Sequence, residues 1–230
     1  MNSAVIVFPG SNCDRDAFDA MQAAGLKPSY VWHAEASLPK KLDLVVLPGG
    51  FSFGDYLRCG AMAARSPIMQ DVIRFADKGG YVLGICNGFQ ILTESGLLPG
   101  TLMRNAHLKF RCKDTNLRVE ANDSPFLAGY SKGQVVNFPV AHAEGNYFAD
   151  DDTLKRLHDG DQVALRYATP EGKVTAEANP NGATQNIAGI TNARKNVLGL
   201  MPHPERHADP ALGGTDGQVL FKSILTQLAA

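Results

Sequence analysis

The chain has 230 residues, of which 44% are hydrophobic and 20% are charged. This composition lets a chain bury enough apolar surface to offset its conformational entropy, and it excludes an intrinsically disordered protein. Twenty-two Lys and Arg residues against 23 Asp and Glu residues leave a net charge of −1, so we expect no nucleic acid partner.

Length and hydropathy also limit the number of domains and the compartment. A chain of 230 residues is short for two full domains, and we expect one domain over residues 1–230. No apolar stretch approaches the ~20 residues of a membrane span, and the first apolar run, residues 4–8, is too short for the core of a signal peptide. These features predict a cytoplasmic protein with no membrane partner.

The first hundred residues alternate between strand-like and helix-like segments. Continuous apolar runs at residues 4–8, 42–47 and 81–85 favour strands that are covered on both faces, as in a parallel sheet. Residues 14–24 and 67–78 have helical character, and each segment is followed by glycine, the preferred residue after a helix C-terminus. The alternation predicts a doubly wound α/β fold with a mostly parallel sheet.

The pattern then changes to shorter and more polar segments. Residues 117–120, 135–140 and 163–167 are predicted to form antiparallel strands and hairpins that are inserted in the parallel sheet. Two further strands are expected at residues 187–191 and 197–201. The sequence shows no repeat, linker or low-complexity segment that would divide the chain.

The last segment, residues 218–228, is amphipathic and predicts a helix. Its apolar side chains Val219, Leu220, Ile224 and Leu228 are expected near one face.

The four cysteines are Cys13, Cys59, Cys86 and Cys112, and none belongs to a C-x-x-C pair. The sequence therefore predicts neither a zinc cluster nor a disulfide framework. We expect Cys13, Cys59 and Cys112 to be structural or incidental thiols, because they show no histidine partner in any sequence pattern.

Cys86 differs from the other cysteines because it lies between a strand-like and a helix-like run and is flanked by Gly84 and Gly88. A nucleophile on a sharp strand-to-helix turn needs small residues two positions to either side. The first amides of the following helix also favour the thiolate over the thiol. A buried structural cysteine is the alternative, but the flanking glycines favour a nucleophile.

A thiolate nucleophile needs a base, and the candidate is His203 with Glu205 as the group that orients it. Pro204 disfavours a helix at His203, so we expect an extended run in which residues i and i+2 point to the same side. A metal pair of His203 and His207 is an alternative, but it needs a helix where Pro204 stands. Exposed polar residues after a strand are the second alternative. We expect no metal.

Amide hydrolysis also needs hydrogen-bond donors for an oxyanion. Gly49 and Gly50, which follow Pro48 at the end of a strand-like run, offer backbone amides without side chains, and the amide of Asn87 follows the candidate nucleophile. An ordinary glycine turn is the alternative. The position at the carboxyl end of a neighbouring strand favours a site, because open α/β sheets bind ligands there.

These motifs resemble the class I, or triad, glutamine amidotransferase family over essentially the whole chain. The three motifs are Pro-Gly-Gly at 48–50, Gly-x-Cys-x-Gly-x-Gln at 84–90 and His-Pro-Glu at 203–205. Longer segments narrow the resemblance to the branch whose members are glutaminase subunits in purine biosynthesis. These segments are residues 8–14, 49–58, 87–90, 141–145 and 202–206.

The resemblance implies a flavodoxin-like core and the hydrolysis of glutamine to glutamate and ammonia. It implies Cys86 as nucleophile, His203 as general base and acid, and Glu205 as the orienting carboxylate. It also implies an oxyanion hole made by the amides of Gly50 and Asn87. The implied glutamine-binding residues are Gly49, Phe51, Gln90, His142, Ala143 and Glu144. The family often has glycine where this chain has Ala143.

A partner follows from the absence of a phosphate-binding G-x-x-x-x-G-K-[ST] loop in the sequence. The chain is expected to release ammonia without using it, and to need no cofactor of its own. The resemblance implies a large synthetase subunit, which uses ATP and Mg, and a small accessory subunit.

Two other classes share the fold. Cysteine hydrolases and chaperone-like stress proteins have no ammonia-transfer role and typically carry histidine directly after the cysteine, where this chain has Asn87. A non-enzymatic binding module would be expected to lose Cys86, His203 or Glu205, and all three are present.

The remaining polar residues have structural interpretations. We expect His33, His107 and His158 to be surface or hydrogen-bonded residues rather than ligands. Arg58 and Arg206 lie in family motifs, where a partner interface and salt bridges both remain open.

Overall fold

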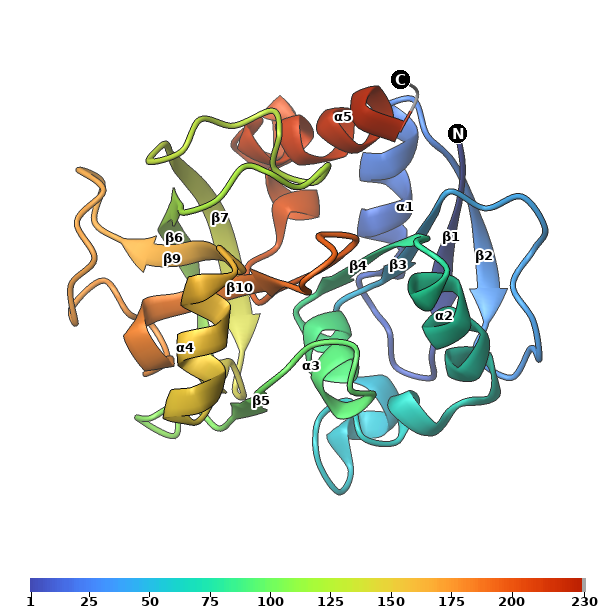
Figure 1. Cartoon of the computed structure of the whole chain (residues 1–230), viewed down its shortest axis with the longest axis horizontal. Coiled ribbons are helices and arrows are strands. Elements are labelled where there is room, and N and C mark those ends of the chain that lie inside the picture. Colours follow the sequence, from blue (N-terminus) through green and yellow to red (C-terminus); the bar gives the residue numbers. More distant parts are fainter. Residues whose placement is uncertain (229–230) are drawn as a thin grey trace.

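The computed structural model describes residues 1–228 (Figure 1). Strands of the main sheet are β1 (Asn2–Val7), β2 (Lys27–Trp32), β3 (Leu44–Leu47), β4 (Tyr81–Ile85), β6 (Arg111–Val119), β7 (Val135–His142), β9 (Val163–Ala168), β10 (Ile187–Thr191) and β11 (Val197–Leu200). Two more strands, β5 (Thr101–Met103) and β8 (Asn146–Phe148), pair with each other in a separate small sheet.

The main sheet has nine strands in the order β2-β1-β3-β4-β11-β10-β9-β6-β7. Neighbours from β2 to β11 are parallel, in the order of a flavodoxin-like sheet. Neighbours from β11 to β7 are antiparallel. The predicted doubly wound sheet with antiparallel strands is confirmed, and the antiparallel strands extend one side of the parallel part.

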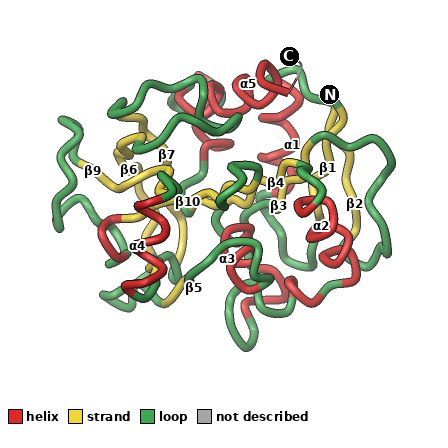
Figure 2. Tube along the Cα trace, in the orientation of Figure 1, coloured by secondary structure: helices red, strands yellow, loops and turns green. Residues whose placement is uncertain are grey.

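Helices lie on both sides of the parallel strands (Figures 1 and 2). They are α1 (Asp14–Ala23), α2 (Pro67–Asp77), α3 (Asn87–Glu94), α4 (Asp151–Asp159) and α5 (Asp216–Leu228). In the view of Figure 1, α1 and α5 lie above the sheet while α2 and α3 lie below it. Among residues 1–228, none of the helices combines the length and the apolar character that crossing a bilayer requires.

Helix ends follow the glycine and proline signals of the sequence. Pro67 occupies the first turn of α2, where its missing N–H costs nothing. Gly25 after α1 and Gly79 after α2 have φ of +94° and +92°, the left-handed conformation that glycine adopts readily. These two helices therefore end where the sequence predicts.

The sequence analysis missed β2 and α4. β2 is an edge strand in which only Val31 is buried, so it lacks the apolar run of the other parallel strands. α4 is mostly polar and buries Leu154 and Leu157 on one side. Its start is fixed by Asp150, whose carboxylate accepts a hydrogen bond from the Thr153 N–H at 2.8 Å.

The predicted C-terminal helix is present as α5. Leu220 and Ile224 are fully buried as expected, Val219 is partly buried, and Phe221 joins the core as well. The side chain of Leu228 lies outside what the structure describes.

Three adjacent parallel strands bring their carboxyl ends to the same edge of the sheet. Leu47 of β3 pairs with Gly84 of β4, and Ile85 of β4 pairs with Leu200 of β11. The far edge strand β7 also reaches this edge, since the Pro139 carbonyl accepts a hydrogen bond from the His203 N–H at 2.8 Å. Residues from both halves of the sheet therefore meet at one place.

The turn between β4 and α3 is packed so closely that it needs both of its glycines. A Cβ atom on Gly84 would lie 2.7 Å from the Gly88 carbonyl oxygen. A Cβ atom on Gly88 would lie 1.9 Å from the Leu47 carbonyl oxygen. The small residues that the sequence places around Cys86 thus let α3 approach β3.

We predict that Gly88→Ala lowers the free energy of unfolding by ~2–3 kcal/mol, because the added methyl group overlaps backbone that cannot move freely. Gly160→Ala is the matched control, since the nearest atom to its Cβ, at 2.8 Å, is the terminal amide oxygen of the Gln162 side chain rather than backbone. Urea denaturation of both variants measures the difference. Equal stability of the two variants would contradict this account of the turn.

Candidate active site

Cys86 stands on the predicted strand-to-helix turn between β4 and α3. Its φ of 50° and ψ of −105° are unusual for a residue with a side chain and indicate backbone strain. The turn is held by the Cys86 N–H, which donates to the Leu200 carbonyl oxygen at 2.8 Å. Cys86 therefore lies directly before the first turn of α3.

His203 and Glu205 are both buried, and His203 Nδ1 lies 2.5 Å from Glu205 Oε1. The expected contact is present, but the expectation of an extended run through Glu205 was wrong. Residues Pro204–His207 form a short 3-10 turn after His203. Proline suits the first position of such a turn because its φ is already fixed near −65° and its missing N–H is not needed.

The charge state of His203 is set by its two neighbours. Burial by itself lowers the pKa of an imidazole, but the carboxylate of Glu205 and the sulfur of Cys86 outweigh it and raise the pKa of His203 to about 10. Cys86 Sγ also lies 3.9 Å from the Ala141 carbonyl oxygen of β7. The site thus favours a charged imidazolium between a carboxylate and a sulfur atom.

Cys13 lies in the same cluster, although no sequence pattern pairs it with a histidine. Its Sγ, a ring nitrogen of His203 and a carboxylate oxygen of Glu205 all lie within 4.8 Å of one another. Burial, followed by the charge of Glu205, raises the pKa of Cys13 to about 12. Cys13 therefore remains a neutral thiol near pH 7, and its position in the loop before α1 lacks the strand-to-helix turn of Cys86.

Cys13, His203 and Glu205 are the one group among residues 1–228 with metal-binding atoms close enough to share an ion. The group does not include His207, whose ring packs against Gly214. Arg206 Nη2 lies 2.9 Å from Cys13 Sγ, so a positive charge already stands beside the sulfur. This arrangement disfavours a second cation there.

The two arginines form salt bridges within the chain. Arg206 Nε lies 3.1 Å from Asp16 Oδ2 of α1. Arg58 Nη2 lies 2.6 Å from Glu94 Oε1 of α3, and the same guanidinium also donates to Thr101. The sequence left two roles open for these arginines, a partner interface and salt bridges, and the structure shows the salt bridges.

The glycines at 49 and 50 are required by close packing. A Cβ atom on Gly49 would lie 2.8 Å from His203 Cε1, and one on Gly50 would lie 2.7 Å from Ser11 Cα. Gly50 also has a φ of +142°. The Gly49 carbonyl accepts a hydrogen bond from the Cys13 N–H at 3.3 Å, so the Gly50 N–H of the same peptide points away from Cys13. The Asn87 N–H opens α3 and has no acceptor within the helix.

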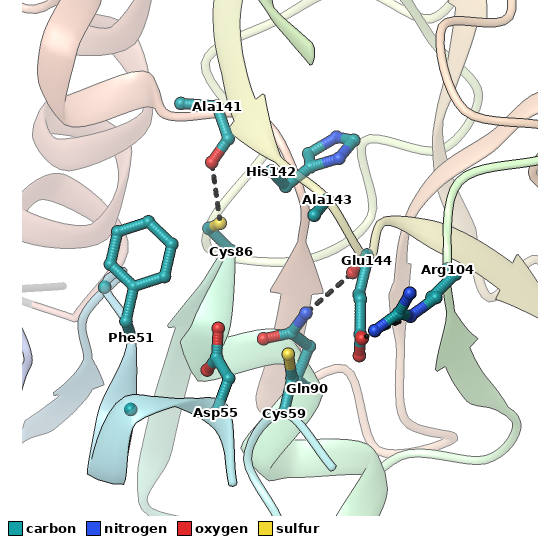
Figure 3. Close-up of a pocket in the computed structure, with 12 residues that line it drawn as sticks. Phe51, Asp55, Cys59, Cys86, Gln90, Arg104, Ala141, His142, Ala143 and Glu144 are labelled. Atoms are coloured by element: carbon teal, nitrogen blue, oxygen red, sulfur yellow. Dashed lines mark hydrogen bonds and ion pairs between the residues drawn. The ribbon is translucent and has the colours of Figure 1, made fainter. Parts of the chain in front are cut away.

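A cavity of about 310 Å³ opens beside Cys86 (Figure 3). Five of the six predicted glutamine-binding residues line it: Phe51, Gln90, His142, Ala143 and Glu144. Gly50 lines it in place of Gly49, and the sequence analysis missed Asp55, Cys59 and Arg104. A second cavity of about 200 Å³ contains Cys13, His203 and Arg206, and Cys86 lines both cavities.

Gln90 is held in a fixed orientation at the wall of the larger cavity. Its Nε2 donates to the Glu144 carbonyl oxygen at 2.6 Å, and its Oε1 accepts from Asn87 Nδ2 at 2.9 Å. The side chain therefore links the start of α3 to the segment that follows β7.

His142, at the wall of the cavity, is buried in a polar network that the sequence analysis missed. Asn105 Oδ1 accepts from His142 Nδ1 at 3.1 Å and from the Gly145 N–H at 3.0 Å. Asn181 Nδ2 lies 3.5 Å from His142 Nε2. Burial and the neighbouring His203 lower the pKa of His142 to about 3, so the ring stays neutral and supports the segment after β7.

The other singled-out residues lie outside this cluster. His107 Nε2 lies 2.8 Å from the Pro180 carbonyl oxygen, and His158 Nε2 lies 2.6 Å from Gln185 Oε1, as expected for hydrogen-bonded histidines. His33 packs against the rings of Phe8, Trp32 and Phe53. Cys112 is exposed.

Comparison with known proteins gives full-length matches. The CobB/CobQ-like glutamine amidotransferase domain matches residues 1–213. The phosphoribosylformylglycinamidine synthase subunit PurQ of Rhodopseudomonas palustris is 60% identical over 230 residues, covering 100% of this chain and 99% of that protein. The PurQ subunit of Rhodospirillum rubrum is 58% identical, with 100% of both chains covered.

Solved structures agree with the fold. A chain of the PurLQS structure from Thermotoga maritima superposes with a TM-score of 0.87 at 44% identity, covering 99% of this chain and 98% of that one. A glutamine amidotransferase from the same organism has a TM-score of 0.63 at 16% identity, covering 99% and 97%. At that identity the second likeness concerns the fold alone.

The lowered pKa of His142 predicts acid-dependent stability. Its folded pKa of about 3 lies below the ~6.5 of an unfolded histidine, so the unfolded state binds more protons between these pH values. The free energy of unfolding should therefore decrease as pH falls below ~6.5, by up to ~1.4 kcal/mol per pH unit. His142→Gln should lack this contribution. Urea denaturation between pH 7 and pH 4.5 compares the two proteins, and parallel pH profiles would contradict the prediction.

Proposed function

The chain belongs to the CobB/CobQ-like glutamine amidotransferase family, and from this membership we propose that it is the glutaminase subunit of a phosphoribosylformylglycinamidine synthase. The observation that carries the proposal is the 60% identity to a PurQ subunit over the full length of both chains. The chain hydrolyses glutamine to glutamate and ammonia. The ammonia serves the conversion of formylglycinamide ribonucleotide to formylglycinamidine ribonucleotide in purine biosynthesis.

In the proposed mechanism, the Cys86 thiolate attacks the amide carbon of glutamine. The N–H groups of Gly50 and Asn87 bind the oxyanion that forms, and the His203 imidazolium gives a proton to the leaving nitrogen. Ammonia leaves and a thioester remains on Cys86. His203 then takes a proton from water, which attacks the thioester and releases glutamate.

The raised pKa of His203, about 10, supports its role as the acid of the first half-reaction. Glu205 keeps the imidazole in one tautomer through the 2.5 Å contact to Nδ1, which leaves Nε2 for proton transfer. Asn87, directly after Cys86, argues against the cysteine hydrolases and stress proteins that carry histidine at that position.

We propose further that the ammonia is used by a partner. The most similar solved chain considered above belongs to a PurLQS structure. The partners are then a large synthetase subunit, which binds ATP and Mg, and a small accessory subunit, while this chain binds glutamine. A reducing compartment such as the cytoplasm suits its four free cysteines.

Replacement of the proposed nucleophile should separate glutamine-dependent synthesis by the assembled complex from synthesis that uses added ammonia. Cys86→Ala is expected to reduce glutamine-dependent synthesis by at least ~1,000-fold, because the covalent path is lost, while synthesis from added ammonia persists. Cys112→Ser, at an exposed thiol, should leave both activities unchanged. Equal loss of both activities in Cys86→Ala would contradict the assignment.

The same experiment must distinguish Cys86 from Cys13, which also lies near His203. An electrophilic glutamine analogue should modify Cys86 and leave the neutral Cys13 thiol intact, as read by peptide mass spectrometry. Modification of Cys13 in the wild-type protein would instead identify Cys13 as the nucleophile.

The isolated chain is predicted to be a weak glutaminase. Turning the Gly49–Gly50 peptide would redirect the Gly50 N–H at the cost of the 3.3 Å hydrogen bond between the Cys13 N–H and the Gly49 carbonyl. If partner binding selects the competent orientation, turnover should rise by ~100- to 1,000-fold, the value of one oxyanion donor. Ammonia release at saturating glutamine, with and without partners, ATP and formylglycinamide ribonucleotide, measures this ratio. Full activity of the chain alone would exclude such a switch.

A further inference from the structure

The second cavity, of about 200 Å³, holds a positive charge that no step of the proposed mechanism uses. Arg206 lines this cavity together with His203 and Cys86. Arg206 Nη2 donates a hydrogen bond to Cys13 Sγ at 2.9 Å, and Arg206 Nε lies 3.1 Å from Asp16 Oδ2 of α1. Both ends of the guanidinium are held, so its charge is fixed beside the reactive groups.

Glu205 lacks a partner for half of its carboxylate. Its Oε1 contacts His203 Nδ1 at 2.5 Å, whereas its Oε2 is buried and has no hydrogen-bond partner among residues 1–228. A carboxylate offers about four acceptor sites, and a buried carboxylate with few hydrogen bonds stays ionised only where a cation lies nearby. The His203 imidazolium is one such cation.

The imidazolium is not a permanent countercharge. In the proposed mechanism His203 gives its proton to the leaving nitrogen, and the thioester that remains on Cys86 carries no charge. The ring must then be neutral, because it has to take a proton from water. During this interval Glu205 is a buried carboxylate beside a neutral histidine, and a second cation is needed to keep it ionised.

Arg206 has the position and the chemistry of that second cation. A guanidinium remains protonated throughout the pH range in which enzymes work. Burial lowers the pKa of Arg206, but Cys13 and the carboxylates of Glu205 and Asp16 outweigh it and raise the pKa. The attraction between Arg206 and Glu205 is reciprocal, so the guanidinium stabilises the carboxylate as well.

Cys13 separates the two charges. Its Sγ lies within 4.8 Å of a ring nitrogen of His203 and of a carboxylate oxygen of Glu205. Arg206 donates to this sulfur and forms its ion pair with Asp16 rather than with Glu205. A guanidinium in direct contact with Glu205 would compete with the imidazole for the carboxylate. The neutral thiol therefore keeps the positive charge close and leaves the contact between His203 and Glu205 intact.

The other titratable groups around His203 and Glu205 do not supply a permanent positive charge. His142 of β7 is neutral, because burial and the neighbouring His203 lower its pKa to about 3. The cations of α1 and α5, Arg15 and Lys222, are exposed. The elements packed against the pair otherwise bring acids, thiols and one histidine, namely Asp16, Asp19, Asp209, Asp216, Cys13, Cys86 and His207.

We propose that Arg206 is a positioning residue that keeps Glu205 ionised while His203 is neutral, and that Cys13 is the spacer between the two charges. The assignment rests on the proposed glutaminase function and gives Arg206 a role in one step of it. Arg206 is needed for hydrolysis of the thioester, when the imidazolium is absent, and less for formation of the thioester.

The test follows decay of the glutamyl thioester in the assembled complex between pH 6 and pH 9, by rapid quench and mass spectrometry of this chain. Arg206→Gln removes the charge, so Glu205 and His203 together hold their proton more tightly and neutral His203 forms only at higher pH. We expect the pH profile of decay to move up by ~1 pH unit. Decay should then be ~10-fold slower below pH 7 and should recover toward pH 9.

Two further arginine variants show whether the charge is what matters. Arg206→Lys keeps the charge and should restore the wild-type pH profile to within ~0.3 pH unit. Arg15→Gln is the control, because it removes an exposed arginine of α1 that pairs with Asp19, and it should leave the profile unchanged.

The spacer is tested at Cys13. Cys13→Ala opens room for the guanidinium to reach Glu205, so it should slow both formation and decay of the thioester. Cys13→Ser keeps a small polar group between the charges and should retain both rates more fully than Cys13→Ala. Unchanged rates in Cys13→Ala would overturn the spacer role.

A loss of equal size at every pH in Arg206→Gln, or the same loss in Arg206→Lys, would indicate a merely structural role and overturn the proposal. An unchanged pH profile in Arg206→Gln would overturn it as well. All three results leave the glutaminase assignment in place. If the wild-type complex formed no thioester and hydrolysed no glutamine, the proposed function itself would fail, and the role of Arg206 with it.

Discussion

The parallel hydrogen-bonded register of β3, β4 and β11 brings the carboxyl ends of these three neighbouring strands to the same edge of the sheet. The strands end at Leu47, Ile85 and Leu200. Everything at the candidate site is placed by this register: a glycine turn follows the first strand, Cys86 the second and His203 the third. The close packing of Gly88 on the Leu47 carbonyl locks α3 against the same strands. A shift of one residue in any of the three would separate the groups by ~3.3 Å and turn side chains to the opposite face.

Burial of charge is the second constraint. His203 and Glu205 are almost inaccessible to water, so neither can hold a charge unless the other compensates it. Arg206 adds a positive charge near the carboxylate and is itself anchored by Asp16 of α1. The β7 strand closes the site from the far end of the sheet through Pro139 and Ala141. The antiparallel half thus supplies one wall of the candidate site, while Cys86 and His203 follow strands of the parallel half.

The sequence predicted those features whose structure is determined by residues close together in the chain. The apolar runs of β1, β3 and β4, the glycines after α1 and α2, and the two glycines around Cys86 each specify a nearby geometry. The sequence did not predict contacts between residues that are far apart in the chain and lie outside the motifs. Cys13 meets His203 only through folding, and Asn105 meets His142 in the same way. The β2 strand is mostly exposed because it lies at the sheet edge, so it lacks the continuous apolar run of a buried strand. Asp55 reaches the cavity through a left-handed turn that no sequence pattern predicts.

The positive φ of Cys86 has a consequence for the protein's evolution. Holding a side chain in that conformation costs ~1–3 kcal/mol, which glycine at the same position would not incur. The fold would therefore become more stable by losing the residue that we assign to its chemistry. Selection for stability alone would remove the enzyme while preserving the scaffold, so the thiol persists at position 86 only under selection for activity.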